Sequence, residues 1–504
     1  MQALFDQGRL APCPNPFNLA AYVLQHADDL PDKIALAVLG LSGSERWSYA
    51  KLKSAVLSVS AGLLEEGLRP GDRVLIRLGN SVDFPLAYLG AIAVGIVPIP
   101  TSSQLTEPEV RKIASIVNPK AAIVAPDIVC PDDLGFQIIS EAQFRDYRNL
   151  PPAEFDMGDP DRLAYILFTS GTSGKPSAVM HAHRAIWARQ MMFADWYDLK
   201  QDDRLLHAGA LNWSFTLGTG VMDPWTIGAT SLIPADGIDL SALPLLLKRH
   251  DATIFAAAPG VYRKLTQIGV MLSLPKLRHG LTAGEKLPES VRTSWQDATG
   301  TQVFEAFGMS ECSTFISGCC SSFPAAGTLG KPQSGRRVAI MGEDGPADFE
   351  QEGVIAVAKD DPGLMLGYLD NDEDTQRKIH GDWFLTDDVG LMHEDFSITY
   401  QGRRDDVMNA GGFRVSPIEV EKAFAHFPEM HEIAVTDVEV KADTRIIAAF
   451  YTADNDLSEV ALKEHAEENL ARYKQPRIYQ RVETLPRGAN NKLLRKELRR
   501  KALQ

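Results

Sequence analysis

The stretch YILFTSGTSGKPSAVMH, from Tyr165 to His181, decides how this chain is interpreted. An apolar run enters a loop rich in glycine and hydroxyl residues, and Ala-Val-Met leaves it. Glycines let backbone N–H groups converge on anionic oxygens, and hydroxyls add donors. The glycines are three residues apart and Lys175 precedes a proline, so this is not a Walker A loop. The segment predicts a phosphate loop between two strands; by itself it also fits a polar surface hairpin.

The sequence on both sides alternates between helix-like and strand-like runs, which predicts an α/β fold of β-sheets covered by helices. The predicted strands are Arg73–Arg77, Ala121–Val124, Ser231–Ile233, Ile254–Ala256 and His279–Leu281. The predicted helices are Ala50–Glu66, Phe84–Val94, Leu240–His250 and Gly260–Leu272. These runs belong to one large N-terminal domain, for which we expect residues 1–403.

Near Gln401 the pattern changes to that of a small, mobile α+β domain, expected at residues 404–504. SPIE begins a helix, with Ser416 as N-cap, Pro417 in the first turn and Glu419 at the capping-box position. Short β-runs, a further helix and a basic end follow; these are Ile433–Val435, Ile446–Tyr451, Ser458–Leu470 and the segment after Arg472.

Composition excludes several classes of protein. The 504 residues are 45% apolar and 23% charged, typical of a globular protein of several domains. Five cysteines lack zinc spacing, so we expect free thiols in a reducing cytoplasm. The N-terminus does not have the pattern of a signal peptide, and Phe84–Thr106 contains three prolines, so no membrane insertion is expected.

Charge is unevenly distributed. The chain has 51 Lys and Arg against 66 Asp and Glu, a net charge of −15, whereas the segment from Arg472 to Gln504 alone carries +9. Nucleic-acid binding normally needs a broad basic face. A basic end on an acidic body instead suits a phosphorylated small molecule, and we expect no nucleic-acid partner.

Six motifs in order resemble the acyl-adenylate-forming superfamily, which contains acyl- and aryl-CoA synthetases, peptide-synthetase adenylation domains and firefly-type luciferases. The similarity runs from about Pro31 to Arg500. The motifs are TSGTSGKP at Thr169–Pro176, AGE at Ala283–Glu285, FGMSE at Phe307–Glu311, FLTDDVG at Phe384–Gly390, GRRDDVMNAGGFRVSPIEVE at Gly402–Glu421 and LPRGANNKLLR at Leu485–Arg495.

The resemblance implies a role for each matching residue. ATP and AMP would be bound by Thr169, Ser170, Gly171, Thr172, Ser173, Gly174, Lys175, Gly284, Glu285, Phe307, Gly308, Asp388 and Arg403. The implied catalytic residues are Lys492, Ser310, Glu311 and Arg414. Glu311 would also hold Mg²⁺, Asp405 would be the hinge, and Gly411 and Gly412 would lie along CoA.

The implied reaction joins a carboxylic acid to ATP, giving acyl-AMP and pyrophosphate, and then transfers the acyl group to CoA. Both first reactants are anions, so positive charge is needed where charge builds up, and a metal ion and Lys492 would supply it. Because Lys492 belongs to the mobile domain, closure of that domain would assemble the site.

The chain departs from the family pattern at several positions. Ser177 and Ala178 follow Pro176, so the usual loop lysine is absent, which predicts weaker ATP binding. Asn491 stands in place of glycine before the catalytic lysine, and Asp387 replaces the glycine of the Thr-Gly-Asp motif.

The acid pocket is expected to be built by Asn212–Gly218 and Cys312–Gly318, which contain no charged residue. Because an unpaired buried charge is costly, the pocket predicts an acid with an uncharged body. Candidate lining residues are Trp213, Ser214, Phe215, Ala283 and Thr314; for the two aromatic residues, pocket walls are favoured over simple core packing. The segments resemble those of benzoate-type aryl-CoA ligases and, in MDPW, medium-chain synthetases.

Several functions remain open at this point. The favoured one is an AMP-forming acyl- or aryl-CoA ligase for an uncharged, preferably benzoate-like acid, with a medium-chain fatty acyl-CoA synthetase as the alternative. An enzyme that loads a carrier protein, or a catalytically weak nucleotide or acyl binder, would share the fold. The sequence leaves the oligomeric state open.

Overall fold

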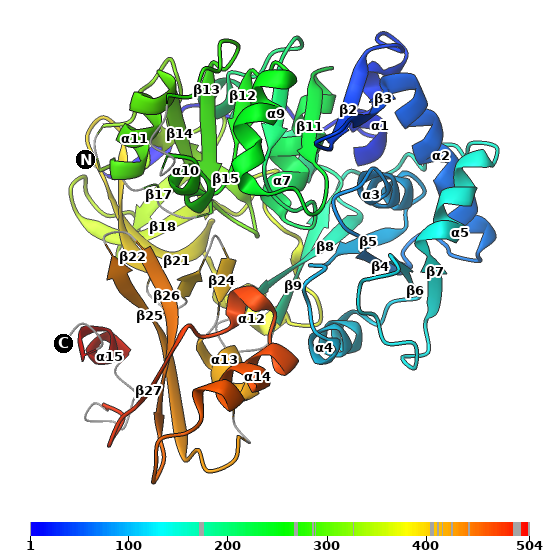
Figure 1. Cartoon of the computed structure of the whole chain (residues 1–504). Coiled ribbons are helices and arrows are strands. Elements are labelled where there is room, and N and C mark those ends of the chain that lie inside the picture. Colours follow the sequence, from blue (N-terminus) through cyan, green and yellow to red (C-terminus); the bar gives the residue numbers. More distant parts are fainter. Residues whose placement is uncertain are drawn as a thin grey trace.

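The computed structural model describes residues 2–170, 176–266, 271–284, 287, 289–325, 327–403, 408–410, 413–415, 417–424, 427–441, 444–486 and 495–501. Figure 1 shows a large N-terminal domain, blue to yellow, with a smaller C-terminal domain, orange to red, below it. The mixed α/β architecture predicted from the sequence is confirmed.

A long, largely parallel sheet forms the upper part of the large domain. Its described strands, in spatial order, are β16 (Lys331–Pro332), β15 (Ser313–Ser317), β14 (Gln302–Met309), β13 (His279–Ala283), β12 (Ile254–Ala256), β10 (Arg204–His207), β11 (Thr230–Pro234), β2 (Ile34–Leu39) and β3 (Ser44–Ser48). The strands from β14 to β2 pair in parallel, and antiparallel strands close both edges.

Two further sheets complete the α/β part of the domain. A parallel sheet contains β5 (Val97–Pro100), β4 (Arg73–Arg77), β6 (Ala121–Val124) and β7 (Gln137–Ser140). An antiparallel sheet contains β19 (Gly367–Tyr368), β9 (Pro176–Ala182) and β8 (Leu163–Ser170). The expected strand after the glycine-rich loop is therefore present as β9.

An antiparallel sheet forms the rest of the large domain. It contains β1 (Leu4–Asp6), β17 (Arg337–Met341), β18 (Glu352–Ala358), β21 (Trp383–Met392), β20 (Ile379–His380) and β22 (Ile398–Arg403). The helices of the domain are α1 (Leu19–Val23), α2 (Tyr49–Glu65), α3 (Asp83–Ala93), α4 (Glu107–Val117), α5 (Glu141–Asp146), α6 (Ala185–Ala188), α7 (Ser214–Leu217), α8 (Asp223–Thr226), α9 (Leu243–Arg249), α10 (Pro259–Thr266), α11 (Glu289–Thr299) and α12 (Asp372–Arg377).

Helix α3 is the clearest case in which burial follows from sequence. All of its residues are buried, as expected for a helix that is apolar on every side. It contacts α1, α2, β4 and β5, and so lies inside the domain. The predicted sequence of a buried helix followed by a strand in this region is confirmed.

The C-terminal domain has two small sheets and three described helices. The sheets are β23 (Met408–Ala410) with β24 (Phe413–Val415), and β25 (Glu432–Lys441) with β26 (Thr444–Thr452) and β27 (Ile478–Arg481). The helices are α13 (Pro417–Ala423), α14 (Glu459–Asn469) and α15 (Arg495–Lys501). Helix α14 begins as predicted, since the Ser458 side chain accepts from the Ala461 N–H. The predicted N-cap Ser416 lies outside the described residues.

Two predicted helices differ from the structure. The run predicted as one helix over Leu240–His250 splits into a 3₁₀ turn at Leu240–Ala242 and α9, because Pro244 occupies the first turn of the α-helix. The helix predicted over Gly260–Leu272 is α10, described to Thr266; residues 267–270 lie outside the described residues, and Met271 and Leu272 are not helical.

Candidate active site

A cavity of about 280 Å³ lies between the two domains, and sequence segments far apart converge on it. Nine residues predicted from the sequence line it: Thr169, Trp213, Ser214, Phe215, Ala283, Gly284, Gly308, Ser310 and Thr314. They come from the loop entry, the predicted acid-binding segment and the ends of neighbouring strands. The structure therefore brings the predicted acid-pocket residues and some of the predicted nucleotide residues to one cavity, whereas Phe307, Glu311 and Asp388 are not among its lining residues.

The parallel sheet explains part of this convergence. Ala283 ends β13 and Gly308 lies near the end of β14, so both are at the carboxyl edge of the sheet, where open α/β sheets bind ligands. At Gly308 the chain has no room for a side chain, because a Cβ would lie 2.3 Å from the carbonyl oxygen of Ser313. This close approach brings the segment after β14 back along the cavity.

His181 positions the backbone of Ser310. Its Nε2 lies 2.8 Å from the Ser310 carbonyl oxygen, which can only accept, so Nε2 carries the hydrogen. The ring stacks on Tyr165 with centroids 4.9 Å apart. Burial lowers the pKa of His181 to about 4, so the ring is neutral at physiological pH. His181 thereby couples the strand after the glycine-rich loop to the segment that carries the predicted catalytic serine and glutamate.

Four buried histidines make stability depend on pH. Burial lowers the pKa of His181 and His279 to about 4, and that of His183 and His207 to about 3. The unfolded chain, with a histidine pKa near about 6.5, takes up protons first as the pH falls. The stability contributed by the neutral rings is complete above about pH 6.5 and is lost toward pH 4, by about 2 kcal/mol per ring at pH 5.

We therefore expect the apparent Tm, followed by circular dichroism, to be clearly lower at pH 5 than at pH 7.5. His207 is fully buried and neither ring nitrogen has a hydrogen-bond partner among the described residues. His207→Leu should therefore reduce the difference in Tm between the two pH values. An equal Tm at both pH values would contradict this account.

Glu311 presents one free carboxylate oxygen in a buried position. Tyr368 OH donates to its Oε1 at 2.8 Å, whereas Oε2 has no hydrogen-bond partner among the described residues. The residue is 8% exposed. A buried carboxylate oxygen of this kind fits a hard cation that takes oxygen ligands. No group of three or more possible metal-ligating side chains occurs among the described residues.

Asp388 lies on β21 next to the large sheet. Its Oδ1 accepts from Tyr400 OH at 3.1 Å, and Tyr400 in turn contacts the ring of Phe307. The register of β21 with β22 puts the backbone of Arg403 opposite Asp388. Asp387 has a φ of 66°, which explains why glycine suits this position, and its carboxylate pairs with Lys378.

Other predicted site residues lie outside the described residues: Gly171, Thr172, Ser173, Gly174, Lys175, Glu285, Asp405, Gly411, Gly412 and Lys492. The side chains of Ser170, Arg403 and Arg414 are also outside them. Their implied roles stay predictions.

The aromatic residues of the acid segment serve as both wall and core. Trp213 and Phe215 both line the cavity, with ring centroids 5.1 Å apart at an angle of 82°. Behind them, Phe215 packs on Trp196 at 5.8 Å and on His207 at 4.4 Å. The sequence left open whether these aromatic residues are pocket walls or core residues. In the structure they line the cavity on one side, and Phe215 packs against the core on the other.

Sequence reasoning missed a charged residue that lines the cavity. Arg189 follows α6, outside both predicted acid segments, and pairs with the fully buried Asp223. The two predicted acid segments contain no charged residue, as the sequence shows, but a charged side chain from a third segment also lines the cavity. A signal was available, because Asp223 stands in the apolar run GVMDPW and a buried carboxylate needs a partner.

Sequence reasoning also missed an ionic contact between the domains. Lys474 Nζ lies 2.9 Å from Glu109 Oε1 on α4 and 3.0 Å from Glu419 Oε1 on α13. Burial alone would lower the pKa of Lys474, but Tyr473 and the two carboxylates outweigh it and raise that pKa. Figure 1 shows α4 beside α13 and α14, where the two domains meet.

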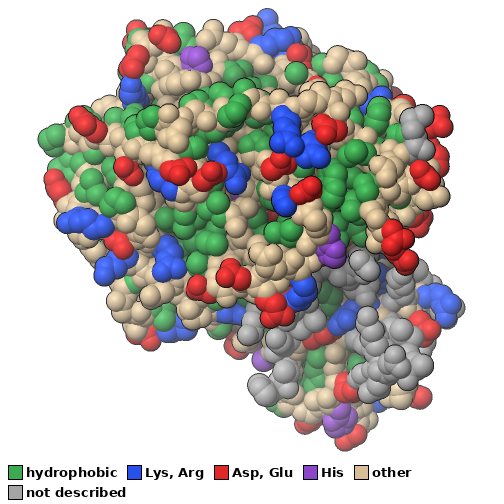
Figure 2. Space-filling view, turned by 180° about the vertical axis from the view of Figure 1, so that it is seen from behind, with side chains coloured by type: hydrophobic (Ala, Val, Ile, Leu, Met, Phe, Trp, Pro, Cys, Tyr) green, Lys and Arg blue, Asp and Glu red, His purple; other side chains and the backbone are tan. Residues whose placement is uncertain are grey.

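The surface carries no broad basic face in the view from behind. Figure 2 shows Lys and Arg side chains interspersed with Asp and Glu, and the smaller domain projecting from the larger one. No helix among the described residues has the length and apolar character needed to cross a membrane.

This fold and site define the class of adenylate-forming enzymes. The chain belongs to the AMP-binding enzyme family, whose model matches residues 23–369, and the model of the AMP-binding enzyme C-terminal domain matches residues 419–492. It is 29% identical to the mitochondrial acyl-coenzyme A synthetase ACSM3 of Rattus norvegicus, over 90% of this chain and 84% of that protein. It is 28% identical to the benzoate–CoA ligase of Thauera aromatica, over 94% of this chain and 95% of that protein.

A solved structure of the o-succinylbenzoate CoA synthetase of Bacillus subtilis, a double mutant bound to its product analogue, matches with a TM-score of 0.85. The match covers 95% of this chain and 98% of the solved chain, with 22% sequence identity. The superfamily predicted from the sequence motifs is confirmed.

Proposed function

We propose that this protein is an AMP-forming acyl- or aryl-CoA ligase that activates an uncharged, preferably benzoate-like carboxylic acid with ATP and transfers it to CoA. The observation that carries the proposal is the single cavity that collects Thr169, Ser310, the acid-segment aromatics and the C-terminal Phe413. A medium-chain fatty acid is the second candidate substrate, because an alkyl chain also fits walls of Trp213 and Phe215 and the relatives include ACSM3.

In the proposed site, Thr169 and the loop after it hold the ATP phosphates, and Ser310 contacts the α-phosphate. Asp388 is an acceptor-only carboxylate suited to the two ribose hydroxyls. Mg²⁺ would be held by Glu311 Oε2, the free buried oxygen, and would supply charge stabilisation at the phosphates. His181 keeps Ser310 in position, and Trp213 and Phe215 orient the body of the acid.

The domain arrangement suits the second half of the reaction. Phe413 directly follows Gly411 and Gly412, the predicted CoA contacts, and lines the cavity. Its ring stacks on Tyr473 at 4.1 Å and lies 6.2 Å from that of Trp213. A described residue of the C-terminal domain, Phe413, thus lies beside the predicted acid pocket, which supports transfer of the acyl group to CoA at this place. The similarity in fold to a CoA synthetase solved with a product analogue supports the proposal that the acyl group is transferred to CoA.

Lys474 is expected to hold the C-terminal domain in its position against α4 of the large domain. Replacing it with methionine leaves two nearby carboxylates buried without a cation, and losing one partner of a buried ion pair typically costs about 3–5 kcal/mol. We expect Lys474→Met to slow thioester formation from supplied acyl-AMP about tenfold or more, with a smaller effect on acyl-AMP formation. Stopped-flow assays of the separate half-reactions measure both.

Lys463→Met is the matched control, because Lys463 is half exposed and its ion pair among the described residues is with Glu459 on the same helix. Equal slowing by both substitutions, or equal slowing of both half-reactions by Lys474→Met, would contradict the positional role of Lys474.

The proposed activity is tested by measuring pyrophosphate release and thioester formation with a panel of aromatic and aliphatic acids, with and without CoA. AMP and thioester that depend on both acid and CoA support the ligase. Acyl-AMP that forms without consumption of CoA would indicate carrier loading, and no AMP with any acid would indicate a nucleotide or acyl binder. We further propose a domain boundary between residues 403 and 404, with the hinge at Asp405, and a cytoplasmic location.

A further inference from the structure

A buried cluster of ionic and hydroxyl groups lies against the acid pocket. Arg189 Nε and Nη2 donate to the two carboxylate oxygens of Asp223, each at 2.7 Å. Tyr197 OH lies 2.7 Å from Asp223 Oδ2 and 2.8 Å from Thr219 Oγ1. Arg189 Nη1 donates to Ser313 Oγ. The cluster joins the π-helical turn at Gly218–Met222 to the segment after β14.

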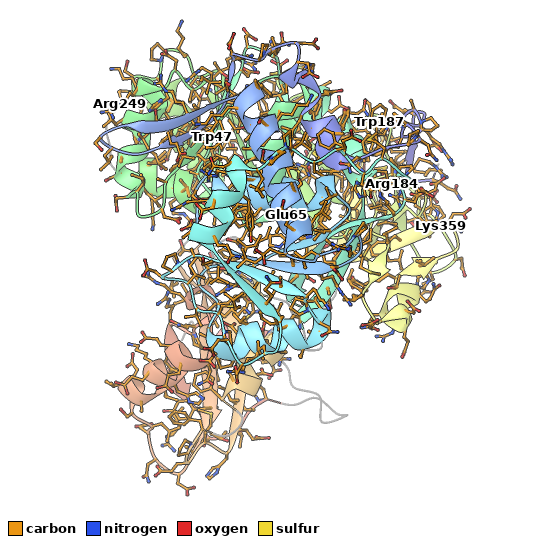
Figure 3. The ribbon with its side chains drawn as sticks, turned by 90° about the vertical axis from the view of Figure 1, so that its right-hand side faces the viewer. Trp47, Glu65, Arg184, Trp187, Arg249 and Lys359 are labelled. Atoms are coloured by element: carbon orange, nitrogen blue, oxygen red, sulfur yellow. The ribbon has the colours of Figure 1, made fainter. Side chains whose placement is uncertain are left out.

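Packing and hydrogen bonds hold Arg189 and the segment before it in place. The guanidinium packs closely against Gly218, where a Cβ would come within 2.6 Å of Cζ. The backbone before Arg189 is held by Arg184 Nη1, which donates to Leu364 O at 3.1 Å, and by Trp187 Nε1, which donates to Ala11 O at 2.9 Å. Figure 3 labels Arg184 and Trp187 at the same edge of the large domain.

Arg189 has one more donor than the cluster uses. A guanidinium carries five N–H groups. Nε and Nη2 are occupied by Asp223 and by the Tyr197 and Thr219 hydroxyls, and Nη1 uses one hydrogen on Ser313. The second Nη1 hydrogen has no partner in the described part of the chain. Asp223 is fully buried, whereas the Arg189 side chain is 10% exposed and lines the cavity.

The ion pair that carries the free donor presents almost no net charge to a ligand in the cavity. Asp223 holds its charge directly against the guanidinium, so the pair presents no net positive charge to the cavity. A second carboxylate on the substrate would lose its hydration without gaining a full counter-charge. A ring with no polar group would leave the N–H unsatisfied, at a cost of about 1–3 kcal/mol. The best match is an uncharged hydrogen-bond acceptor.

We propose that Arg189 selects acids whose body carries an uncharged acceptor, such as a hydroxyl, ether or carbonyl oxygen, which receives the free Nη1 hydrogen. This inference rests on the proposed ligase activity and narrows its substrate class from uncharged acids to acceptor-bearing ones. The acceptor distinguishes these acids both from unsubstituted benzoate or alkanoates and from dicarboxylic acids.

The test compares kcat/KM for benzoate, 3- and 4-hydroxybenzoate, isophthalate, hexanoate and 5-oxohexanoate. The ratio of interest is kcat/KM for the better acceptor-bearing acid divided by kcat/KM for its unsubstituted counterpart. In the unmodified protein we expect this ratio to be about ten and isophthalate to have the lowest kcat/KM. Arg189→Met combined with Asp223→Leu replaces the ion pair by apolar groups, and we expect it to bring that ratio close to one. Ser313→Ala keeps the ion pair and frees a second Nη1 hydrogen, so we expect the preference for the acceptor-bearing acid to persist or to increase in this variant.

The matched control is Arg336→Met combined with Asp361→Leu, a buried Arg–Asp pair that does not line the cavity, and it should leave the ratio unchanged. No preference for the acceptor in the unmodified protein, a preference for isophthalate, or an equal fall of the ratio in the control would overturn the inference while leaving the ligase activity established. Absence of AMP with every acid would instead overturn the proposed function, and this inference with it.

Discussion

Alanine at Lys492 is expected to reduce acyl-AMP formation by at least about 100-fold while sparing thioester formation from supplied acyl-AMP. In the first step a carboxylate approaches a phosphorus surrounded by anionic oxygens, so a cation placed at the developing charge contributes several kcal/mol. Lys492 lies outside the described residues, but its near neighbour Arg495 is fixed to the C-terminal domain. Arg495 Nη2 lies 2.6 and 2.8 Å from the two oxygens of Glu421. We expect the lysine to act from that domain, as its place in the sequence predicts.

The measurement is single-turnover pyrophosphate release with ATP and acid, set beside thioester formation from synthetic acyl-AMP and CoA. Lys463→Ala, an exposed lysine of the same domain, is the control and should leave both rates unchanged. Equal loss of both half-reactions in Lys492→Ala would show that the lysine does not act in the first step alone.

Glutamine at Glu311 is expected to lower acyl-AMP formation by about 100-fold, with a higher Mg²⁺ concentration needed for half-maximal rate. The amide keeps the size and the hydrogen bond from Tyr368 but removes the charge that would hold a cation at Oε2. Loss of one well-placed electrostatic contact in a catalytic site commonly costs about 3–4 kcal/mol, which corresponds to a factor of this order.

Tyr368→Phe separates the effect of the Glu311 charge from the effect of the Glu311 position. It removes the donor to Oε1 and leaves the carboxylate charged, so we expect a fall of about tenfold or less without the change in Mg²⁺ dependence. Steady-state rates over a range of Mg²⁺ concentrations distinguish the variants. A Glu311→Gln enzyme with the Mg²⁺ dependence of the unmodified protein would argue against Glu311 as the metal ligand.

Much of the large domain could be predicted from local patterns. The strands Arg73–Arg77, Ala121–Val124 and Ile254–Ala256 have the predicted limits in the structure. Short apolar runs bounded by turn residues have few alternatives inside a parallel sheet, where both faces are buried. The helix over Leu240–His250 was less predictable, because a 3₁₀ turn and an α-helix share nearly the same apolar spacing.

The candidate site could be predicted where a residue belongs to a contiguous motif. Ser310 and Gly308 belong to FGMSE and line the cavity as neighbours along one strand end. Arg189 and Lys474 belong to no such motif. Arg189 depends on Asp223, 34 residues later in the chain, and Lys474 depends on Glu109, 365 residues away. The sequence shows that a buried charge needs a partner, but not which residue supplies it.

The amino-acid sequence by itself determined the superfamily, the order of the structural elements and the glycine-rich loop, because these depend on residues that are neighbours in the chain. Only the tertiary structure decided that Arg189 lines the cavity and that Lys474 joins two carboxylates between the domains. The physical reason is that burying a charge is favourable only when oppositely charged atoms meet within about 3 Å, and distant segments meet at that range only after folding.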